Sequence, residues 1–179
     1  MLFDIYSMVL RAVSGLLIDV LLLRFWMQAI HMRPPYNVGE FVYTLSDWLV
    51  KPMRKIIPGV GGLDWASLIS ALLIAVLAAV LQIVWFYSLE PVGIIKIALM
   101  TLVTATYWGL FFLLLLMVAI SWINPHAPIA PFVYGLLNPL LRPIRRVIPT
   151  IGNIDFSAMV LMLILVIAFN VATMLIARL

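Results

Sequence analysis

Four long apolar stretches dominate the chain, and shorter segments that carry most of the charges separate them. The stretches run approximately over residues 3–30, 65–87, 94–123 and 157–177. A helix needs about 20 apolar residues to cross the hydrocarbon core of a bilayer, so each stretch is long enough. Their apolar residues are continuous rather than alternating, which excludes the strands of a membrane barrel. The pattern therefore predicts an all-α, polytopic membrane protein with four transmembrane helices.

The two longer connections have a different pattern, in which apolar and polar side chains separate onto two faces of a helix. In the first connection the apolar face comprises Phe41, Leu45, Trp48, Leu49, Pro52 and Ile56, and the polar face Glu40, Thr44, Asp47, Lys51, Arg54 and Lys55. In the second connection Phe132, Leu136, Pro139, Leu140, Pro143 and Val147 oppose Asn138, Arg142, Arg145 and Arg146.

Such two-faced segments are typical of amphipathic helices that lie in the membrane interface, with their cations among anionic head groups. Packing of these segments against the spans is the alternative, and both arrangements can hold at once. Proline lacks an amide proton and interrupts a helix, so Pro52 and Pro143 predict two short helices in each segment.

The two halves of the chain repeat one another. Residues 51–58 (KPMRKIIP) return 91 positions later as residues 142–149 (RPIRRVIP). At the same shift Tyr43 becomes Tyr134, Gly61 becomes Gly152, and Asp64 becomes Asp155. We therefore expect two tandem modules, each a span, an interfacial segment and a second span. They cover residues 1–90, with the interfacial segment at 34–64, and residues 91–179, with the interfacial segment at 125–155.

Composition and charge support this arrangement. Of 179 residues 66% are apolar and only 10% are charged, whereas soluble domains carry about 25% charged residues. Most cations lie in the two longer connections: Arg33, Lys51, Arg54, Lys55, Arg142, Arg145 and Arg146. Cytoplasmic loops are enriched in Lys and Arg, so we expect a multi-pass protein of the bacterial inner membrane with these segments cytoplasmic and both termini outside. The cations are few and no nucleic-acid-binding motif accompanies them, so nucleic acid is not an expected partner.

A glycine turn and an aspartate precede the second span of each module. Gly61 and Gly152 permit the positive φ of a chain reversal. Asp64 and Asp155 stand immediately before apolar runs, where a carboxylate caps free amide groups. We favour capping, while pairing with Arg54 and Arg145, or a cation-binding site, are the alternatives.

Ionisable and amide side chains inside the predicted spans are the candidate functional residues: Arg11, Asp19, Arg24, Gln82 and Asn170. A charge near the middle of a span costs several kcal/mol and often marks function, so Asp19 is the first candidate. Neither arginine falls beside Asp19 on the helical wheel. Gly15 would allow a neighbouring helix to approach closely.

The predicted depths of these residues suggest neighbours. Gln82 and Asn170 are expected at the depth of Arg11, and Thr104 and Tyr107 nearer Asp19. Asp19 is then either a proton- or cation-sensitive site or a structural hydrogen-bonding group, and we favour the structural role. The equivalent positions of span three hold Leu102, Leu110 and Leu115, so only the first half carries these charges.

No catalytic, cofactor or metal site emerges. The sequence has no cysteine, which removes thiolate chemistry. His31 and His126 have no adjacent carboxylate cluster, and Ser121 has no base beside it. The start lacks the basic region of a signal peptide, so we expect the first span to be retained. The sequence predicts a protein that is not an enzyme.

The repeated basic-Pro-x-Arg-basic core, the glycine turn and the aspartate before the next span resemble the YggT family, over nearly the whole chain. The second copy also has residues 121–125 (SWINP), which look like the family's end of span, whereas residues 30–34 (IHMRP) of the first copy depart from it. The first copy has residues 46–48 (SDW), and the second 137–139 (LNP), where relatives often carry Thr-Glu-Pro.

The resemblance implies a role in membrane organisation rather than in chemistry. Bacterial relatives are linked to tolerance of osmotic shock, others to division or envelope shape, and plastid relatives to maturation of a membrane cytochrome. We expect a non-enzymatic protein that supports membrane organisation or membrane-protein assembly and osmotic tolerance. Its expected partners are anionic lipids, other membrane proteins or further copies of itself. The alternative is a small oligomeric ion channel or transporter that uses the charges of span one.

Overall fold

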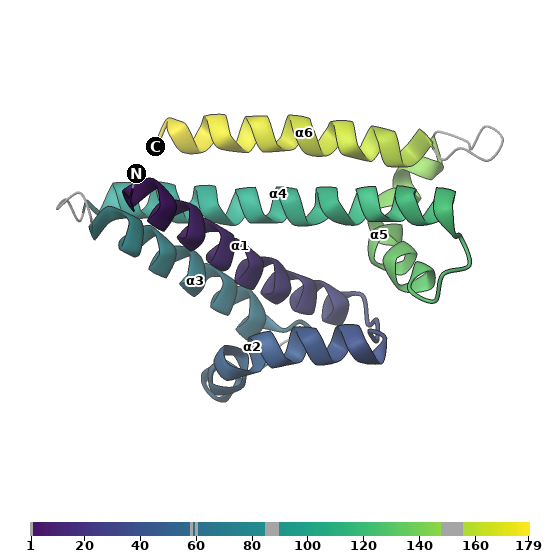
Figure 1. The fold of residues 1–179 in the computed structure, drawn as a ribbon, viewed down its shortest axis with the longest axis horizontal. Coiled ribbons are helices and arrows are strands. Elements are labelled where there is room, and N and C mark those ends of the chain that lie inside the picture. Colours follow the sequence, from purple (N-terminus) through teal and green to yellow (C-terminus); the bar gives the residue numbers. More distant parts are fainter. Residues whose placement is uncertain (1, 58, 60, 85–89, 148–155) are drawn as a thin grey trace. The chain divides into compact units, whose positions relative to one another are not determined.

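The computed structural model describes residues 2–57, 59, 61–84, 90–147 and 156–179. These residues form helices and no strand, which confirms the all-α prediction (Figure 1). The helices are α1 (Leu2–Ala29), α2 (Tyr36–Ile56), α3 (Trp65–Ile83), α4 (Pro91–Ile123), α5 (Ala130–Arg145) and α6 (Phe156–Ala177). Helices α1, α3, α4 and α6 are long and apolar enough to cross a membrane. The chain is therefore built as a multi-pass membrane protein.

Local backbone chemistry sets the end of α1. The amide of His31 donates to the carbonyl of Gln28 and that of Met32 to the carbonyl of Met27, a C-terminal cap that places His31 at a φ of 55°. Prolines 34 and 35 follow, and a proline restricts the residue before it to extended conformations. The chain therefore leaves α1 in an extended segment and starts α2 at Tyr36.

Helix α4 shows the opposite effect of proline at its start. It begins at Pro91, three residues before the predicted 94, because proline suits the first position of a helix, where no amide proton is needed. It ends at Ile123, and the next residue, Asn124, accepts a hydrogen bond of 3.2 Å from the amide of His126. Helices α1 and α4 thus both end a few residues before a proline.

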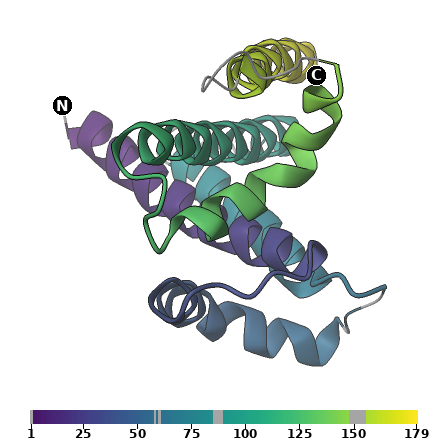
Figure 2. The same cartoon turned by 90° about the vertical axis from the view of Figure 1, so that its right-hand side faces the viewer.

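The chain divides into two compact units, Met1–Thr106 with Ala172–Leu179, and Tyr107–Val171. In the first unit α1 and α3 lie side by side and antiparallel (Figures 1 and 2). The Tyr6 hydroxyl donates to the Leu81 carbonyl at 3.1 Å near one end of the pair. Ala71, Ala75 and Ala79 of α3 are completely buried, since their small side chains let neighbouring helices approach closely.

Helix α2 packs on α1 and α3 through a face that the sequence analysis did not single out. Its buried residues are Gly39, Val42, Ser46 and Val50, spaced by three or four. A β-carbon at Gly39 would lie 3.2 Å from the Pro34 side chain, so glycine favours close packing between α2 and the segment that precedes it. The packing face is therefore made of small or compact side chains.

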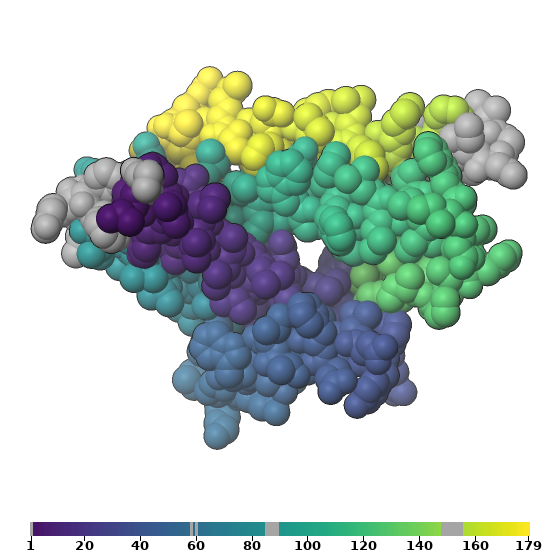
Figure 3. All heavy atoms as spheres, in the orientation of Figure 1, coloured from purple at the N-terminus to yellow at the C-terminus, as the bar shows by residue number. Residues whose placement is uncertain are grey.

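The predicted apolar face of α2 stays largely outside this packing. Phe41, Trp48 and Ile56 are 54%, 61% and 76% exposed. Figure 3 shows α2 in blue as an outer surface of the first unit. Helix α2 therefore has three faces: one buried, one apolar and exposed, and one charged.

The prediction of two short helices in each interfacial segment is wrong. Helix α2 continues through Pro52, and α5 continues through Pro139 and Pro143. Figures 1 and 2 show that both helices bend instead of stopping. The φ of proline is compatible with a helix, so the loss of one backbone hydrogen bond kinks the helix without ending it.

In the second unit α5 buries Ala130, Phe132, Val133, Leu136, Leu137 and Leu141. The rings of Tyr107 in α4 and Phe169 in α6 stack with centroids 4.4 Å apart. Within this unit, aromatic stacking therefore joins the two long helices.

Candidate functional site

The first unit holds a polar cluster where α1, α2 and α3 meet. We define the α1–α2–α3 polar cluster as Arg24, Gln28, Ser46, Asp47, Arg54, Asp64 and Ser67. Its members come from the end of α1, the length of α2, and the start of α3.

Arg24 is the central cation of this cluster, with a side chain only 5% exposed. Its Nη1 donates to Ser46 Oγ at 2.6 Å and to Asp47 Oδ1 at 2.8 Å. The guanidinium carbon lies 5.1 Å from the centroid of the Tyr43 ring, a cation–π distance. A buried guanidinium is costly unless it is paired and hydrogen-bonded, and α2 provides both kinds of partner.

Ser46 links Arg24 to the backbone of α2. It is 1% exposed, accepts from Arg24, and donates its own proton to the Val42 carbonyl at 2.6 Å. Both hydrogen-bonding functions of the hydroxyl are thus used, which fixes the position of the Arg24 side chain.

Asp64 is the central anion, 3% exposed, and occupies the position just before α3. Arg54 donates from Nε to Oδ1 at 3.2 Å and from Nη2 to Oδ2 at 2.5 Å, a two-pronged ion pair. Ser67 Oγ donates to Oδ2 at 2.6 Å, and Arg24 Nε lies 3.6 Å from the same oxygen. Asp64 therefore ties together all three helices.

The sequence analysis favoured capping for Asp64, and the structure shows the alternative. Asp64 stands at the N-cap position, but its side chain makes no capping hydrogen bond to the backbone. The guanidinium of Arg54 competes successfully, because a charged two-pronged hydrogen bond is stronger than one to a neutral amide. The backbone carbonyl of Asp64 accepts from the amides of Ser67 and Leu68 instead.

The pKa values of the cluster follow from these contacts. Burial raises the pKa of the Asp64 carboxyl, but hydrogen bonds from Arg54 and Ser67 outweigh burial and hold the pKa below its ordinary value of 3.8. The hydrogen bond to Asp64 raises the pKa of Arg54 in turn. A hydrogen bond from Lys51 lowers the pKa of Asp47, and Arg24 adds to the effect despite desolvation. Both carboxylates are therefore ionised at neutral pH.

Gln28 extends the cluster to the glycine turn. Its Oε1 accepts from Arg54 Nη2 at 3.3 Å, and its Nε2 donates to the Gly62 carbonyl at 3.4 Å. Gly61 and Gly62 have φ values of 68° and 77°, which side-chain-bearing residues rarely adopt. The turn therefore depends on glycine, as the sequence indicated for Gly61. Gly152 and Asp155 lie outside the described residues.

The geometry of the cluster fits a structural role rather than catalysis. Both carboxylates are occupied by cationic or hydroxyl donors, and no group of three or more potential metal ligands occurs among the described residues. Lys51 Nζ lies 2.8 Å from Asp47 Oδ2 but is 71% exposed, so this exposed pair contributes at most about 0.5 kcal/mol. Arrangements of this kind hold helices in register.

The other intramembrane candidates are not brought together in this way. Asp19 is half-buried in α1, and no hydrogen bond or ion pair joins it to another described residue. Arg11 is exposed and Gln82 half-buried, while the Asn170 amide donates to the Val166 carbonyl of its own helix at 2.7 Å.

The expected close approach at Gly15 is wrong. A β-carbon there would meet nothing within 4 Å, because the helices of the described region pack on other faces of α1. Tyr107 was expected near Asp19, and Asn170 near Arg11. Each pair has one residue in each unit, so these expectations stay predictions.

Sequence reasoning missed several members of the cluster, although the repeat carried a signal for them. Polar residues of the first copy are replaced together in the second: Arg24, Gln28, Ser46 and Ser67 correspond to Leu115, Ala119, Leu137 and Ala158. Buried polar residues need hydrogen-bonding partners. Polar residues of one repeat that are all apolar in the other repeat are therefore candidates for a single hydrogen-bonding network.

Comparison with known proteins places the chain in a family. The CCB3/YggT family model matches residues 2–86 and again residues 96–176. The protein named YggT of Escherichia coli K12 is 36% identical over 162 residues, covering 89% of this chain and 84% of that protein. A Haemophilus influenzae protein is 33% identical over 152 residues, covering 84% and 82%.

A third relative, from Pseudomonas aeruginosa, is 30% identical over 154 residues, covering 83% of this chain and 78% of that protein. All three carry the word "uncharacterized" in their names, and neither these names nor the family description states an enzymatic activity. No solved structure matches the chain significantly. Since the family model covers most of both halves, the chain belongs to the CCB3/YggT family.

Proposed function

We propose that this chain is a non-enzymatic organiser of the bacterial inner membrane. It presents two basic helices along the cytoplasmic surface and supports the arrangement or assembly of other membrane proteins there. The observation that carries the proposal is the fixed position of α2, whose apolar and basic faces stay exposed while a third face and the polar cluster hold it to α1 and α3.

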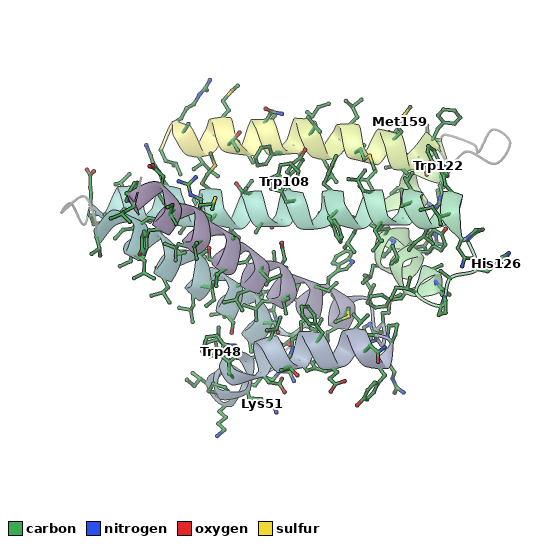
Figure 4. The ribbon with its side chains drawn as sticks, in the orientation of Figure 1. Trp48, Lys51, Trp108, Trp122, His126 and Met159 are labelled. Carbon is green, nitrogen blue, oxygen red and sulfur yellow. The ribbon has the colours of Figure 1, made fainter. Side chains whose placement is uncertain are left out.

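The exposed side chains of α2 suit a lipid interface. Trp48 and Lys51 lie at the bend of α2 (Figure 4), and both are exposed. Indole rings favour the head-group level of a bilayer, and each lysine near an anionic surface contributes about 1 kcal/mol of attraction. Buried ion pairs set the register of the helix, so its lipid-facing side has a defined orientation.

Helix α5 repeats this presentation with different residues. Arg142, Arg145 and Arg146 are exposed at its end, and Val147 is 80% exposed. These cations, with Lys51 and Lys55, are the expected contacts for anionic lipids or for acidic surfaces of membrane partners. The contribution to osmotic tolerance rests on the family resemblance.

The alternative function is a small oligomeric ion channel or transporter. Asp19 favours it, because a half-buried carboxyl in a span, without a partner among the described residues, marks a site for an ion or proton. The two functions predict different results for the same variants.

Co-purification from native membranes in gentle detergent tests the proposal. We expect membrane-protein partners to be captured with wild type and lost with Lys51→Glu/Lys55→Glu or Arg145→Glu/Arg146→Glu. Lys96→Glu, at the predicted outer boundary, is the matched control and should retain them. Retention by both double variants, together with ion flux in proteoliposomes that Asp19→Asn abolishes, would instead establish the alternative.

A further inference from the structure

Helix α2 carries an apolar ridge that its packing on α1 and α3 leaves uncovered. We define the α2 ridge as Phe41, Trp48, Pro52 and Ile56, all of which are exposed. They are seven, four and four residues apart, which places them along one side of a helix. Large apolar side chains that gather on a surface mark a contact with an apolar partner.

The ridge adjoins the apolar surface of the spans. Leu49 and Met53 lie between the ridge and the packed face of α2 on the helical wheel. Both are partly buried and pack against the core that holds Ile18 and Leu21 of α1 and Ala71 of α3. Since α1 and α3 are long and apolar enough to cross a membrane, the hydrocarbon around them is the nearest apolar partner for the ridge.

The indole of Trp48 is suited to hydrocarbon rather than to water. Its Nε1 donates to the Leu45 carbonyl at 2.8 Å, within the same helix. A polar group enters an apolar environment at little cost when it already has a hydrogen-bonding partner. The exposed ring therefore needs no head group or water for its N–H.

The charges beside the ridge do not determine where α2 lies. Glu40, Asp47, Lys51 and Lys55 follow one another on the other side of the helix, and their formal charges cancel. Lys51 Nζ lies 2.8 Å from Asp47 Oδ2. The two acids offset the attraction of the two lysines for an anionic surface.

The α1–α2–α3 polar cluster holds α2 at two places instead. Near the middle of α2, Ser46 accepts from the buried Arg24 at 2.6 Å. At the end of α2, Arg54, its remaining cation, pairs with the buried Asp64. These contacts join α2 to the end of α1 and the start of α3, so they fix its height relative to the two spans.

We propose that the α2 ridge is embedded in the acyl chains of the bilayer, at a depth that the α1–α2–α3 polar cluster sets and head-group charge does not. This inference rests on the proposed function, which puts α2 at the membrane surface, and it names lipid hydrocarbon as the partner of the apolar side. Lys51 and Lys55 stay on the water side of the helix.

The test measures the surroundings of spin labels on the full chain in phosphatidylcholine liposomes. Because the sequence has no cysteine, Phe41→Cys and Ile56→Cys each give one labelled site on the ridge. Electron paramagnetic resonance then compares collisions with oxygen, which concentrates in acyl chains, and with a nickel chelate, which stays in water. Leu77→Cys, exposed on the α3 span, is the lipid-facing control, and Glu40→Cys on α2 is the water-facing control.

The ratio of oxygen to nickel collisions should be shifted at both ridge sites toward that of Leu77→Cys and away from that of Glu40→Cys. A ratio at the ridge equal to that of Glu40→Cys places the ridge in water and overturns the proposal. Exclusion of both reagents shows that protein, such as a second copy, covers the ridge, and this also overturns the proposal.

A second lipid mixture tests the independence from head-group charge. Adding phosphatidylglycerol to the liposomes should leave the ratio at Phe41→Cys and Ile56→Cys unchanged. A ratio that rises at these sites only with phosphatidylglycerol shows that charge draws α2 into the membrane, which contradicts the proposed cause.

Arg54→Gln tests the role of the cluster. Arg54 is 45% exposed, so this variant should fold, and it removes the pair with Asp64. The ratio should fall at Ile56→Cys, near the released end of α2, and persist at Phe41→Cys, because Arg24 still holds Ser46. An unchanged ratio at Ile56→Cys in both Arg54→Gln and Asp64→Asn would show that the cluster does not set the depth.

These outcomes are separate from those of the proposed function. Purified protein in liposomes has no partner proteins, so a ridge found in water leaves partner capture by the basic residues untouched. Retention of partners by both double variants likewise leaves the position of the ridge untouched.

Discussion

At the scale of single residues, Arg24 shows how the partner of a charge determines its role. The residue lies in an apolar span, where an unpaired guanidinium is unfavourable. It is buried because Ser46 and Asp47 of α2 meet it there. A charge that sequence alone marks as a functional candidate is thus an anchor for α2.

Replacing Arg24 by leucine, the residue of the second repeat, should lower the free energy of unfolding by about 2 kcal/mol. The loss stays moderate because Asp47 keeps Lys51 and Asp64 keeps Arg54 as partners. Melting midpoints in detergent measure it, with Leu17→Ile as a control on the same helix. A midpoint equal to that of wild type would show that the anchor is dispensable.

Asp64 should make the stability of the folded protein depend on pH. A carboxyl whose pKa is lowered by folding contributes stability that is fully present above its ordinary pKa of 3.8 and is lost as the pH falls through the lowered value. The contribution of Asp64 to the melting midpoint should therefore be full and constant between pH 8 and about pH 5, and should fall below about pH 4.

Asp64→Asn isolates this effect. The variant should melt lower than wild type at pH 7 and lose less on acidification, because its amide does not titrate. If wild type and variant lose the same amount between pH 5 and pH 3, Asp64 does not carry the dependence.

At the scale of elements, the apolar pattern predicted each span to within a few residues, because each apolar run is continuous and gives way to charged or proline-containing segments at its ends. Helix α3 begins at the predicted Trp65, and the end predicted at 87 falls in residues that the structure does not describe. The face by which α2 packs was missed because Gly39 and Ser46 are small and weakly apolar. Their burial depends on the shape of the neighbouring helices, which no hydropathy pattern contains.

Helices α2 and α5 also show where a local helix-breaking signal did not end a helix. Pro52 predicts a break, yet α2 only bends, since packing against α1 and α3 compensates for one lost hydrogen bond. The pairing of Asp64 with Arg54 stood as an alternative to capping. Whether Asp64 caps α3 or pairs with Arg54 depends on the distance between α2 and the start of α3, which the sequence does not specify.

The glycine turn gives a matched pair of variants at this scale. Gly61→Ala should destabilise the protein by about 1 kcal/mol, because φ is 68° although no atom obstructs the added methyl group. Gly15→Ala in α1 also meets no atom, and it should stabilise by about 0.5–1 kcal/mol, since alanine favours helix. Equal melting midpoints for the two variants would show that backbone conformation at the turn has no such role.

At the scale of the whole molecule, the two repeats share one pattern of elements but differ in their buried polar residues. Both copies keep the basic core and match the family model, and among the described residues the first copy holds the buried polar cluster. The second has apolar residues where the first has Arg24, Gln28, Ser46 and Ser67, and it keeps polar residues, Asn138, Arg145 and Asp155, at the other three equivalent positions. The two copies therefore differ at the positions through which the first copy anchors α2 to α1 and α3.

The central claim is that both interfacial helices lie on the cytoplasmic side of a membrane that the chain crosses four times. The absence of cysteine makes single-cysteine variants a direct test. The positions are Lys55→Cys in α2, Arg146→Cys after α5, and Glu90→Cys and Arg178→Cys on the predicted outer side. An impermeant maleimide applied to spheroplasts should label Glu90→Cys and Arg178→Cys at once, and Lys55→Cys and Arg146→Cys only after permeabilisation. Labelling of Lys55→Cys and Arg146→Cys from opposite sides would contradict the account.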